Sequence, residues 1–122
     1  MQKKLKILII DGSKFIRDYL LNLLQSFNFE VTTATCITDA ARYISSNKFD
    51  FVITNYKLKE MNGVQFKNNY FKSANKKTKF ILMFGFETQL ITENTSDFLE
   101  ILPKPINPKR ILNALTKTSE MN

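Results

Sequence analysis

The chain has 122 residues, the size of one domain, and its 43% hydrophobic and 24% charged residues are the proportions of a soluble globular protein. It contains no histidine, so the commonest general base is absent and hydrolases built on a Ser-His or Cys-His pair are excluded. The one cysteine, Cys36, rules out an internal disulfide and disfavours a cysteine-based metal site.

The formal net charge of +7 is compatible with a polyanionic partner. Arginine, however, forms the best bidentate contacts with bases and phosphates, and the chain has only Arg17, Arg42 and Arg110 among its many lysines. We therefore expect no nucleic-acid binding by this domain alone. No apolar run approaches the ~20 residues that span a bilayer. The opening residues do not form a signal peptide, so we expect a cytoplasmic chain without a membrane partner.

The first half of the chain alternates between two periodicities. Residues 5–10 are a continuous apolar run, which predicts a buried strand, and residues 30–34 predict a shorter one. Between them Ser13 can cap a helix, because apolar residues recur at spacings of three and four: Phe15, Ile16, Tyr19, Leu20, Leu23, Leu24 and Phe27. After the second strand, Thr38 or Asp39 can cap a helix that turns inward Ala40, Ala41 and Ile44.

The second half continues the alternation. In chain order we predict a strand at 49–54, a helix at 64–72, a strand at 79–84, a weak helix at 87–93, a strand at 98–102 and a last helix through about Thr118. Asn107 and Pro108 open that last helix. We treat the lysine-rich 72–79 segment as a solvated connection and expect the terminal residues to fray.

Five strand–helix units with continuous apolar strands predict an α/β domain over residues 1–122, a doubly wound (βα)5 flavodoxin-like fold. Its five-stranded parallel sheet would have the order 2-1-3-4-5. Ligands bind such sheets at the carboxyl ends of the strands. The residues that fall at this edge are Asp11, Gly12, Asn55, Gly85 and Lys104.

Three motifs at these positions resemble the receiver domain of two-component response regulators, of the chemotaxis-receiver kind. They are "ILIIDGS", "FDFVITNYKLKEMNG" and "LPKPI" before a helix. In the second motif the family pattern corresponds to Asn55, Leu58, Met61, Asn62 and Gly63. The resemblance covers essentially the whole chain and implies the same fold. It also implies a cis peptide bond between Lys104 and Pro105.

The resemblance implies a site in which an aspartate after the third strand accepts a phosphoryl group beside a Mg²⁺ ion. Carboxylates hold that ion, and a hydroxyl residue and a lysine bind phosphoryl oxygens. This chain departs from the pattern at most positions: Asn55 replaces the acceptor, Gly12 the second acid, Gly85 the hydroxyl residue and Ile101 the aromatic switch residue on the output face. Only Asp11 and Lys104 remain.

These departures predict a degenerate, atypical receiver, a pseudo-receiver that is not an enzyme, needs no cofactor and binds no Mg²⁺. It would act by phosphorylation-independent contact with a protein partner, such as a signalling protein or a second copy. An amide at Asn55 keeps hydrogen-bonding capacity and removes repulsion with Asp11. Lys104 could pair with Asp11 and bond the Asn55 side-chain oxygen, or it could simply be solvated. Asp11 could also cap the first helix.

Two alternatives remain open. The chain could be phosphorylated at a non-standard residue, for which Glu60, beyond the loop, is the nearest carboxylate after Asn55. It could instead be the N-terminal regulatory fragment of a DNA-binding transcriptional regulator. We also expect a short or irregular fourth helix, and hence a different surface on the helix four, strand five and helix five side. Gly63 is interpreted as a backbone-permissive residue at a loop–helix junction.

Overall fold

The computed structural model describes residues 3–71, 77–85 and 91–120, with no side-chain placement for 117–120. Its strands are β1 (Lys6–Ile10), β2 (Glu30–Ala34), β3 (Phe51–Asn55), β4 (Lys79–Phe84) and β5 (Glu100–Pro103). Its helices are α1 (Lys14–Ser26), α2 (Ile37–Ser46), α3 (Gly63–Tyr70) and α4 (Pro108–Glu120). The predicted strand boundaries agree with these to within two residues.

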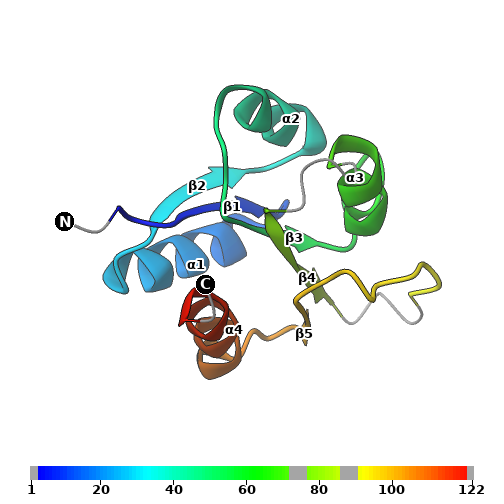
Figure 1. Ribbon diagram of the computed structural model, residues 1–122. Coiled ribbons are helices and arrows are strands. Elements are labelled where there is room, and N and C mark those ends of the chain that lie inside the picture. The colour runs from blue at the N-terminus through cyan, green and yellow to red at the C-terminus, as the bar shows by residue number, and fades with distance from the viewer. Residues whose placement is uncertain (1–2, 72–76, 86–90, 121–122) are drawn as a thin grey trace.

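All neighbouring strands pair in parallel, in the order β2-β1-β3-β4-β5. This confirms the predicted flavodoxin-like order. In Figure 1, α1 and α4 lie on one face of the sheet, and α2 and α3 lie on the other. Because helices cover both faces of the sheet, a central strand is shielded from solvent, and all five residues of β3 are buried.

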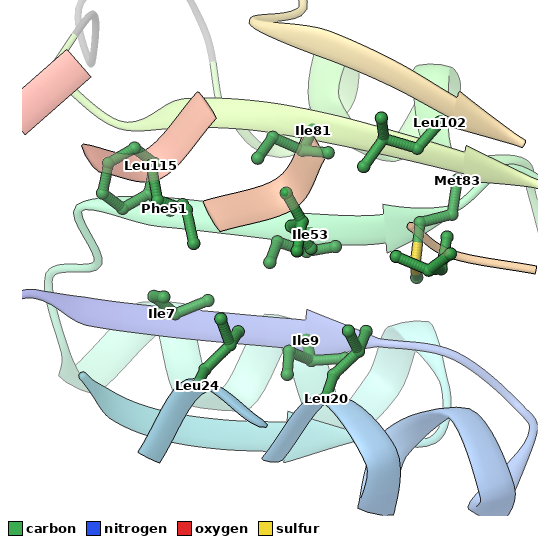
Figure 2. Packing of buried hydrophobic residues seen from close by; sticks show 12 residues of the cluster. Ile7, Ile9, Leu20, Leu24, Phe51, Ile53, Ile81, Met83, Leu102 and Leu115 are labelled. Atoms are coloured by element: carbon green, nitrogen blue, oxygen red, sulfur yellow. The ribbon is translucent and has the colours of Figure 1, made fainter. Parts of the chain in front are cut away.

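Successive side chains of a strand point to opposite faces, so the sheet separates two apolar cores. Ile7 and Ile9 of β1 pack with Leu20 and Leu24 of α1, as Figure 2 shows, and α4 adds Ile111 and Leu115 to the same core. On the other face, the second core joins β1, α2 and α3 through Leu8, Ile10, Ile37, Ala40 and Phe66. This double burial explains why β1 and β4 read as nearly unbroken apolar runs.

The helix starts agree with the sequence prediction at α1 and α4. The Ser13 hydroxyl accepts a hydrogen bond from Ile16 N at 3.3 Å, and the Asn107 side chain accepts one from Lys109 N at 2.9 Å. The predicted cap of α2 at Thr38 or Asp39 is wrong, because the helix begins at Ile37 with Cys36 as its N-cap. The earlier start places Ile37, which is 2% exposed, in the core.

Two other predictions need correction. Phe15 and Phe27 belong to the predicted apolar stripe of the first helix, yet they are 77% and 55% exposed. The sheet covers a narrower face of α1, centred on Leu20 and Leu24. The last helix extends to Glu120 rather than ending near Thr118. No helix of the described segments is long and apolar enough to cross a membrane.

The connection between β4 and β5 takes an irregular path where residues 91–99 can be followed, and we call this segment the strap. The helix predicted at 87–93 lies outside the described residues over 86–90, and residues 91–93 are not helical. The strap ends by joining the sheet, where Leu99 N donates to Phe80 O at 2.7 Å. The described part thus agrees with the expectation of an irregular segment in this region.

Candidate functional site

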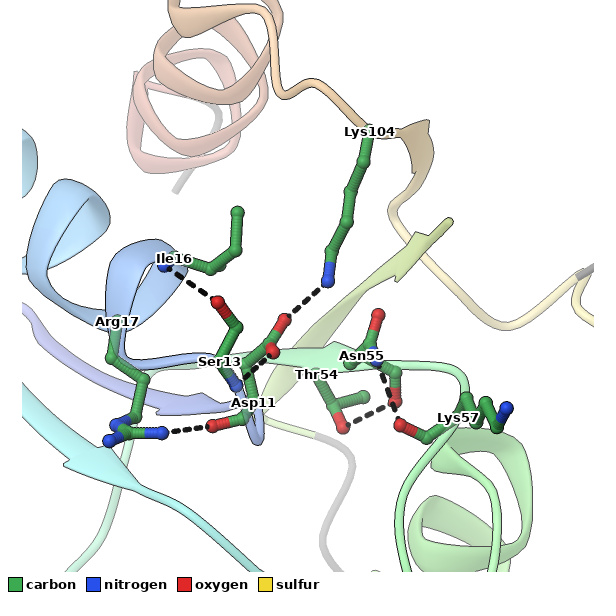
Figure 3. Close-up of polar contacts among 8 residues, drawn as sticks. All are labelled: Asp11, Ser13, Ile16, Arg17, Thr54, Asn55, Lys57 and Lys104. Carbon is green, nitrogen blue, oxygen red and sulfur yellow. Dashed lines mark hydrogen bonds and ion pairs between the residues drawn. The ribbon is translucent and has the colours of Figure 1, made fainter. Parts of the chain in front are cut away.

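Three polar side chains lie near one another at the carboxyl edge of the sheet (Figure 3). Asp11 directly follows β1 and is 2% exposed, and Asn55 ends β3 and is 6% exposed. Lys104 follows β5, and its side chain is 19% exposed. Parallel strands bring their carboxyl ends to one edge, so residues far apart in the chain become neighbours there. We call this group the pocket.

Asp11 is held by contacts on both carboxylate oxygens. Oδ1 accepts a hydrogen bond from Ser13 N at 2.9 Å, which shapes the turn into α1 while Ser13 itself caps the helix. Oδ2 lies 2.8 Å from Lys104 Nζ, so the predicted Asp11–Lys104 pair is present. Oδ2 has no hydrogen-bond partner among the described residues. We treat the contact as an ion pair, because Coulomb attraction depends on distance rather than on alignment.

The side chain of Asn55 bonds locally. Its Nδ2 donates to Lys57 O at 2.8 Å, and its Oδ1 is buried without a hydrogen-bond partner among the described residues. The predicted bond from Lys104 to this oxygen is therefore wrong. The partner of Nδ2 is a carbonyl, which accepts only, so the position facing it must be a donor. A carboxylate at position 55 could not make this contact.

The other predicted positions supply little to the pocket. A Cβ built on Gly12 would meet nothing within 4 Å, so this glycine borders open space. Gly85 follows β4 and is half-buried, and Ile101 is half-buried on β5. The Lys104–Pro105 peptide bond is cis, as the resemblance implied.

Mg²⁺ needs several hard oxygen ligands, mostly carboxylates, in a site of the kind that the resemblance implies. Among the residues that the structure describes, Asp11 alone brings a carboxylate to this pocket, and Lys104 already lies against it. Across the described ranges, no group of three or more His, Cys, Asp or Glu side chains comes together. The residues of the pocket do not fit such an ion.

Gly63 has a different role from the one predicted. No glycine among the described residues has a positive φ, so backbone permissiveness is not what position 63 requires. A Cβ there would lie 2.6 Å from Asn55 O and 3.0 Å from Thr54 Cγ2. The glycine lets the first turn of α3 approach the end of β3 closely, which fixes the helix beside the pocket.

A second polar cluster was not predicted. Glu93 of the strap accepts hydrogen bonds from Tyr56 Oη and Asn62 Nδ2, both at 2.6 Å. We call Tyr56, Asn62 and Glu93 the clasp. The hydrogen bond from Tyr56 lowers the pKa of Glu93, and the hydrogen bond from Asn62 lowers it to a smaller extent. The same bond to Glu93 raises the pKa of Tyr56, since it favours the protonated phenol.

One part of the clasp had a signal in the sequence. Asn62 caps α3 in a capping box with Gln65, in which Gln65 N donates to Asn62 Oδ1 and Asn62 N donates to Gln65 Oε1, both at 2.9 Å. The Asn-x-x-Gln spacing could have predicted this helix start. Glu93 is 37 residues from Tyr56, and no local pattern relates them.

Lys67 of α3 provides a further anchor for the strap. Its Nζ lies 5.6 Å from the ring centre of Phe80 and 5.9 Å from that of Phe98, and 4.0 Å from the Asp97 carboxylate. Cation–π contacts of this kind contribute about 0.5–1 kcal/mol each at exposed sites. The strap is thus fixed to α3 at two points, the clasp and Lys67.

Comparison with known proteins agrees with this architecture. Residues 7–116 match the response regulator receiver domain. Sensory transduction protein LytT of Bacillus anthracis is 28% identical over 93% of this chain, which spans 46% of LytT. Chemotaxis protein CheY of Thermotoga maritima is 26% identical over 94% of this chain and 98% of CheY. A CheY-like receiver domain protein from Methanospirillum hungatei JF-1 superposes with a TM-score of 0.85 at 22% identity, covering 98% and 96% of the two chains, and shares the fold.

Proposed function

Because the chain belongs to the response regulator receiver domain family of two-component signalling, we propose that it is a pseudo-receiver. It transmits its signal through protein–protein contact and does not pass through a phosphorylated state. The observation that carries this proposal is the state of the pocket. The one carboxylate that the described residues bring to it, Asp11, is paired with Lys104 at 2.8 Å, and the acceptor position is the amide of Asn55.

The chemistry of these groups supports the proposal. A carboxylate oxygen can attack phosphorus, whereas an amide nitrogen has its lone pair delocalised and is a poor nucleophile. The Asn55 amide is also engaged with Lys57 O. Asp11 could attack only after losing its contacts with Ser13 N and Lys104, which would leave a buried charge unpaired. The single paired carboxylate likewise supports a pocket without Mg²⁺.

The pocket can still have a signalling role, because the Asp11–Lys104 pair links the end of β1 to the end of β5. The ammonium of Lys104 supplies inside the protein the positive charge that balances Asp11. The carboxyl edge is therefore held in one arrangement without a ligand. A partner would bind a preformed surface and would not select between two states.

The proposal is tested by treating the purified chain with acetyl phosphate and millimolar Mg²⁺ and measuring its intact mass. We expect no phosphoryl adduct, and no saturable heat when Mg²⁺ alone is titrated in a calorimeter. The Gly12→Asp/Asn55→Asp variant is the positive control for Mg²⁺ binding, since position 12 has open space for a side chain. An adduct on Asp11 or on the exposed Glu60 of the natural chain would overturn the proposal.

A further inference from the structure

A hollow of about 500 Å³ lies beside the pocket, between the connections that follow β1, β2 and β3. Its wall is formed by Gly12, Thr35, Cys36, Lys57, Leu58 and Lys59. Three different connections contribute to it, so it is built by the tertiary fold and not by one loop. No carboxylate belongs to its lining.

The floor of the hollow is apolar. Leu58 is half-buried and packs against the core that contains Leu8 and Val52. Cys36 is half-buried at the start of α2, and its side chain makes no capping hydrogen bond. Gly12 adds no side chain, and a Cβ there would point into open space. An acidic residue at position 12, as the family resemblance implies, would extend from this wall, and its absence leaves the hollow open and uncharged on that side.

The rim of the hollow is cationic. Lys57 and Lys59 are both exposed, and neither side chain forms an ion pair with any residue that the structure describes. Some lysines of the chain face carboxylates, as Lys14 faces Asp18 at 2.6 Å. Others, such as Lys4 and Lys48, form no ion pair that the structure describes, so Lys57 and Lys59 are distinguished by lining the hollow. Two uncompensated charges beside an apolar floor form a surface complementary to an acidic segment that also carries an apolar side chain.

We propose that this hollow binds an acidic, partly apolar peptide segment of a protein partner. An apolar side chain of the peptide segment packs on Leu58 and Cys36. The carboxylates of the same segment lie between Lys57 and Lys59. The inference rests on the proposed function, because it names the chemistry of the partner of a pseudo-receiver. The apolar floor favours a peptide over a free inorganic anion, which would gain nothing from Leu58.

The test is a titration of the ¹⁵N-labelled chain followed by amide chemical shifts, with EDTA present and without a phosphodonor. The probe is an acetylated, amidated pentapeptide of sequence Glu-Leu-Asp-Leu-Glu, and Lys-Leu-Lys-Leu-Lys is its control. We expect saturable shifts at Gly12, Cys36 and 57–59 with the acidic peptide only. Inorganic phosphate at the same concentrations should leave these amides unchanged.

A matched pair of variants assigns the binding to the rim. Lys57→Glu/Lys59→Glu should lower the affinity for the acidic peptide at least about tenfold, since it replaces two electrostatic attractions by two repulsions. Lys4→Glu/Lys48→Glu changes the net charge equally, at exposed positions near the amino ends of the strands, and should leave the affinity unchanged. Cys36 is the only cysteine, so the peptide should also slow its alkylation by iodoacetamide by at least about threefold.

Several results would overturn the inference: no shifts at millimolar peptide, equal loss in both double variants, or binding of phosphate without binding of peptide. These failures are separable from failure of the proposed function. A phosphoryl adduct or Mg²⁺ binding contradicts the pseudo-receiver whatever the peptide does. Absence of peptide binding by an unmodified chain contradicts only the role of the hollow.

Discussion

The pocket and the clasp are two polar clusters on either side of the same strand end, and they differ in depth and composition. The pocket buries a full charge, Asp11, against Lys104 at 2.8 Å. The clasp holds Glu93 at the surface with the neutral donors Tyr56 and Asn62. A buried charge must keep its partner, whereas a surface carboxylate can return to water. The pocket should therefore behave as an essential structural unit and the clasp as an adjustable one.

The largest expected effect separates the buried pair from an exposed lysine. Lys104→Ala and Asp11→Ala should each lower the free energy of unfolding by roughly 3–5 kcal/mol, because each leaves a charge without its partner. Lys77→Ala, at an exposed position, should change it by about 0–1 kcal/mol. Urea denaturation followed by circular dichroism measures all three.

The double variant Asp11→Ala/Lys104→Ala sharpens this result. It removes both charges at once, so it should lose clearly less stability than the sum of the single changes. If Lys104→Ala changes the free energy of unfolding as little as Lys77→Ala does, Lys104 does not neutralise Asp11 in the pocket. Lys104 is then free to bind an outside anion.

The next effect compares two glycines beside the pocket. Gly63→Ala should destabilise the protein by roughly 1–3 kcal/mol, because the new methyl group would lie 2.6 Å from Asn55 O. Gly12→Ala should be neutral or stabilising by up to about 1 kcal/mol, since its methyl group meets nothing within 4 Å. Thermal unfolding of the two variants ranks them, and equal melting temperatures would contradict the close approach at Gly63.

A smaller effect is expected at the clasp. Glu93→Gln should cost about 1–2 kcal/mol, since it weakens two hydrogen bonds to a charged acceptor that is only half-buried. Asp97→Asn, whose carboxylate lies 4.0 Å from Lys67 at an exposed site, should cost less than about 1 kcal/mol. Hydrogen exchange should show faster opening of the strap in Glu93→Gln, with β1 and β3 unchanged. Faster exchange throughout the sheet would contradict an adjustable clasp.

The smallest effect is the pH dependence of the clasp. The folded-state pKa of Glu93 lies below its ordinary 4.5, so its contribution is present above about pH 4.5 and is lost as the pH falls through the lowered value. The folded-state pKa of Tyr56 lies above its ordinary 10.0, so its contribution is present below pH 10 and is lost as the pH rises through the raised value. Ultraviolet titration should show a tyrosine that ionises above the ordinary pKa of 10.0, and this signal should be absent in Tyr56→Phe.

The sequence predicted the fold well because the central strands β1, β3 and β4 are almost entirely buried and read as mainly apolar runs. It predicted the Asp11–Lys104 pair because each residue directly follows a strand, β1 or β5, and the carboxyl ends of these strands lie at one edge of the sheet. The position of Asn55 at the end of β3 was predicted correctly, but the predicted bond from Lys104 to its oxygen was wrong. The Asn55 amide instead donates to the backbone two residues on, at Lys57 O, and this local bond orients the side chain.

Other features depend on contacts that spacing does not encode. Gly63 was assigned to backbone freedom, whereas its role is set by the distance to Asn55 O. Helix α2 begins earlier than predicted, at Ile37, because burial of the Ile37 side chain in the core decides where the helix starts. The capping preference of Thr38 or Asp39 does not decide it. The clasp joins Glu93, which comes after β4, to Tyr56 and Asn62 in the connection after the neighbouring strand β3, and it could be found only in three dimensions.

The clasp also bears on the chemical ageing of the protein. Asn62 precedes Gly63, and an Asn-Gly step is the most prone to deamidation, because the following backbone nitrogen attacks the side-chain amide. Here Gly63 N donates to Tyr56 O at 2.7 Å, and the Asn62 amide bonds Glu93, so both reacting groups are held in place. Deamidation would put a carboxylate against Glu93 and repel the strap. The mass of the folded chain should therefore stay that of the intact Asn62 amide on storage. In the urea-unfolded chain, Asn62 should be converted to a carboxylate. The fraction of deamidated Asn62 thus records how long each molecule has spent unfolded.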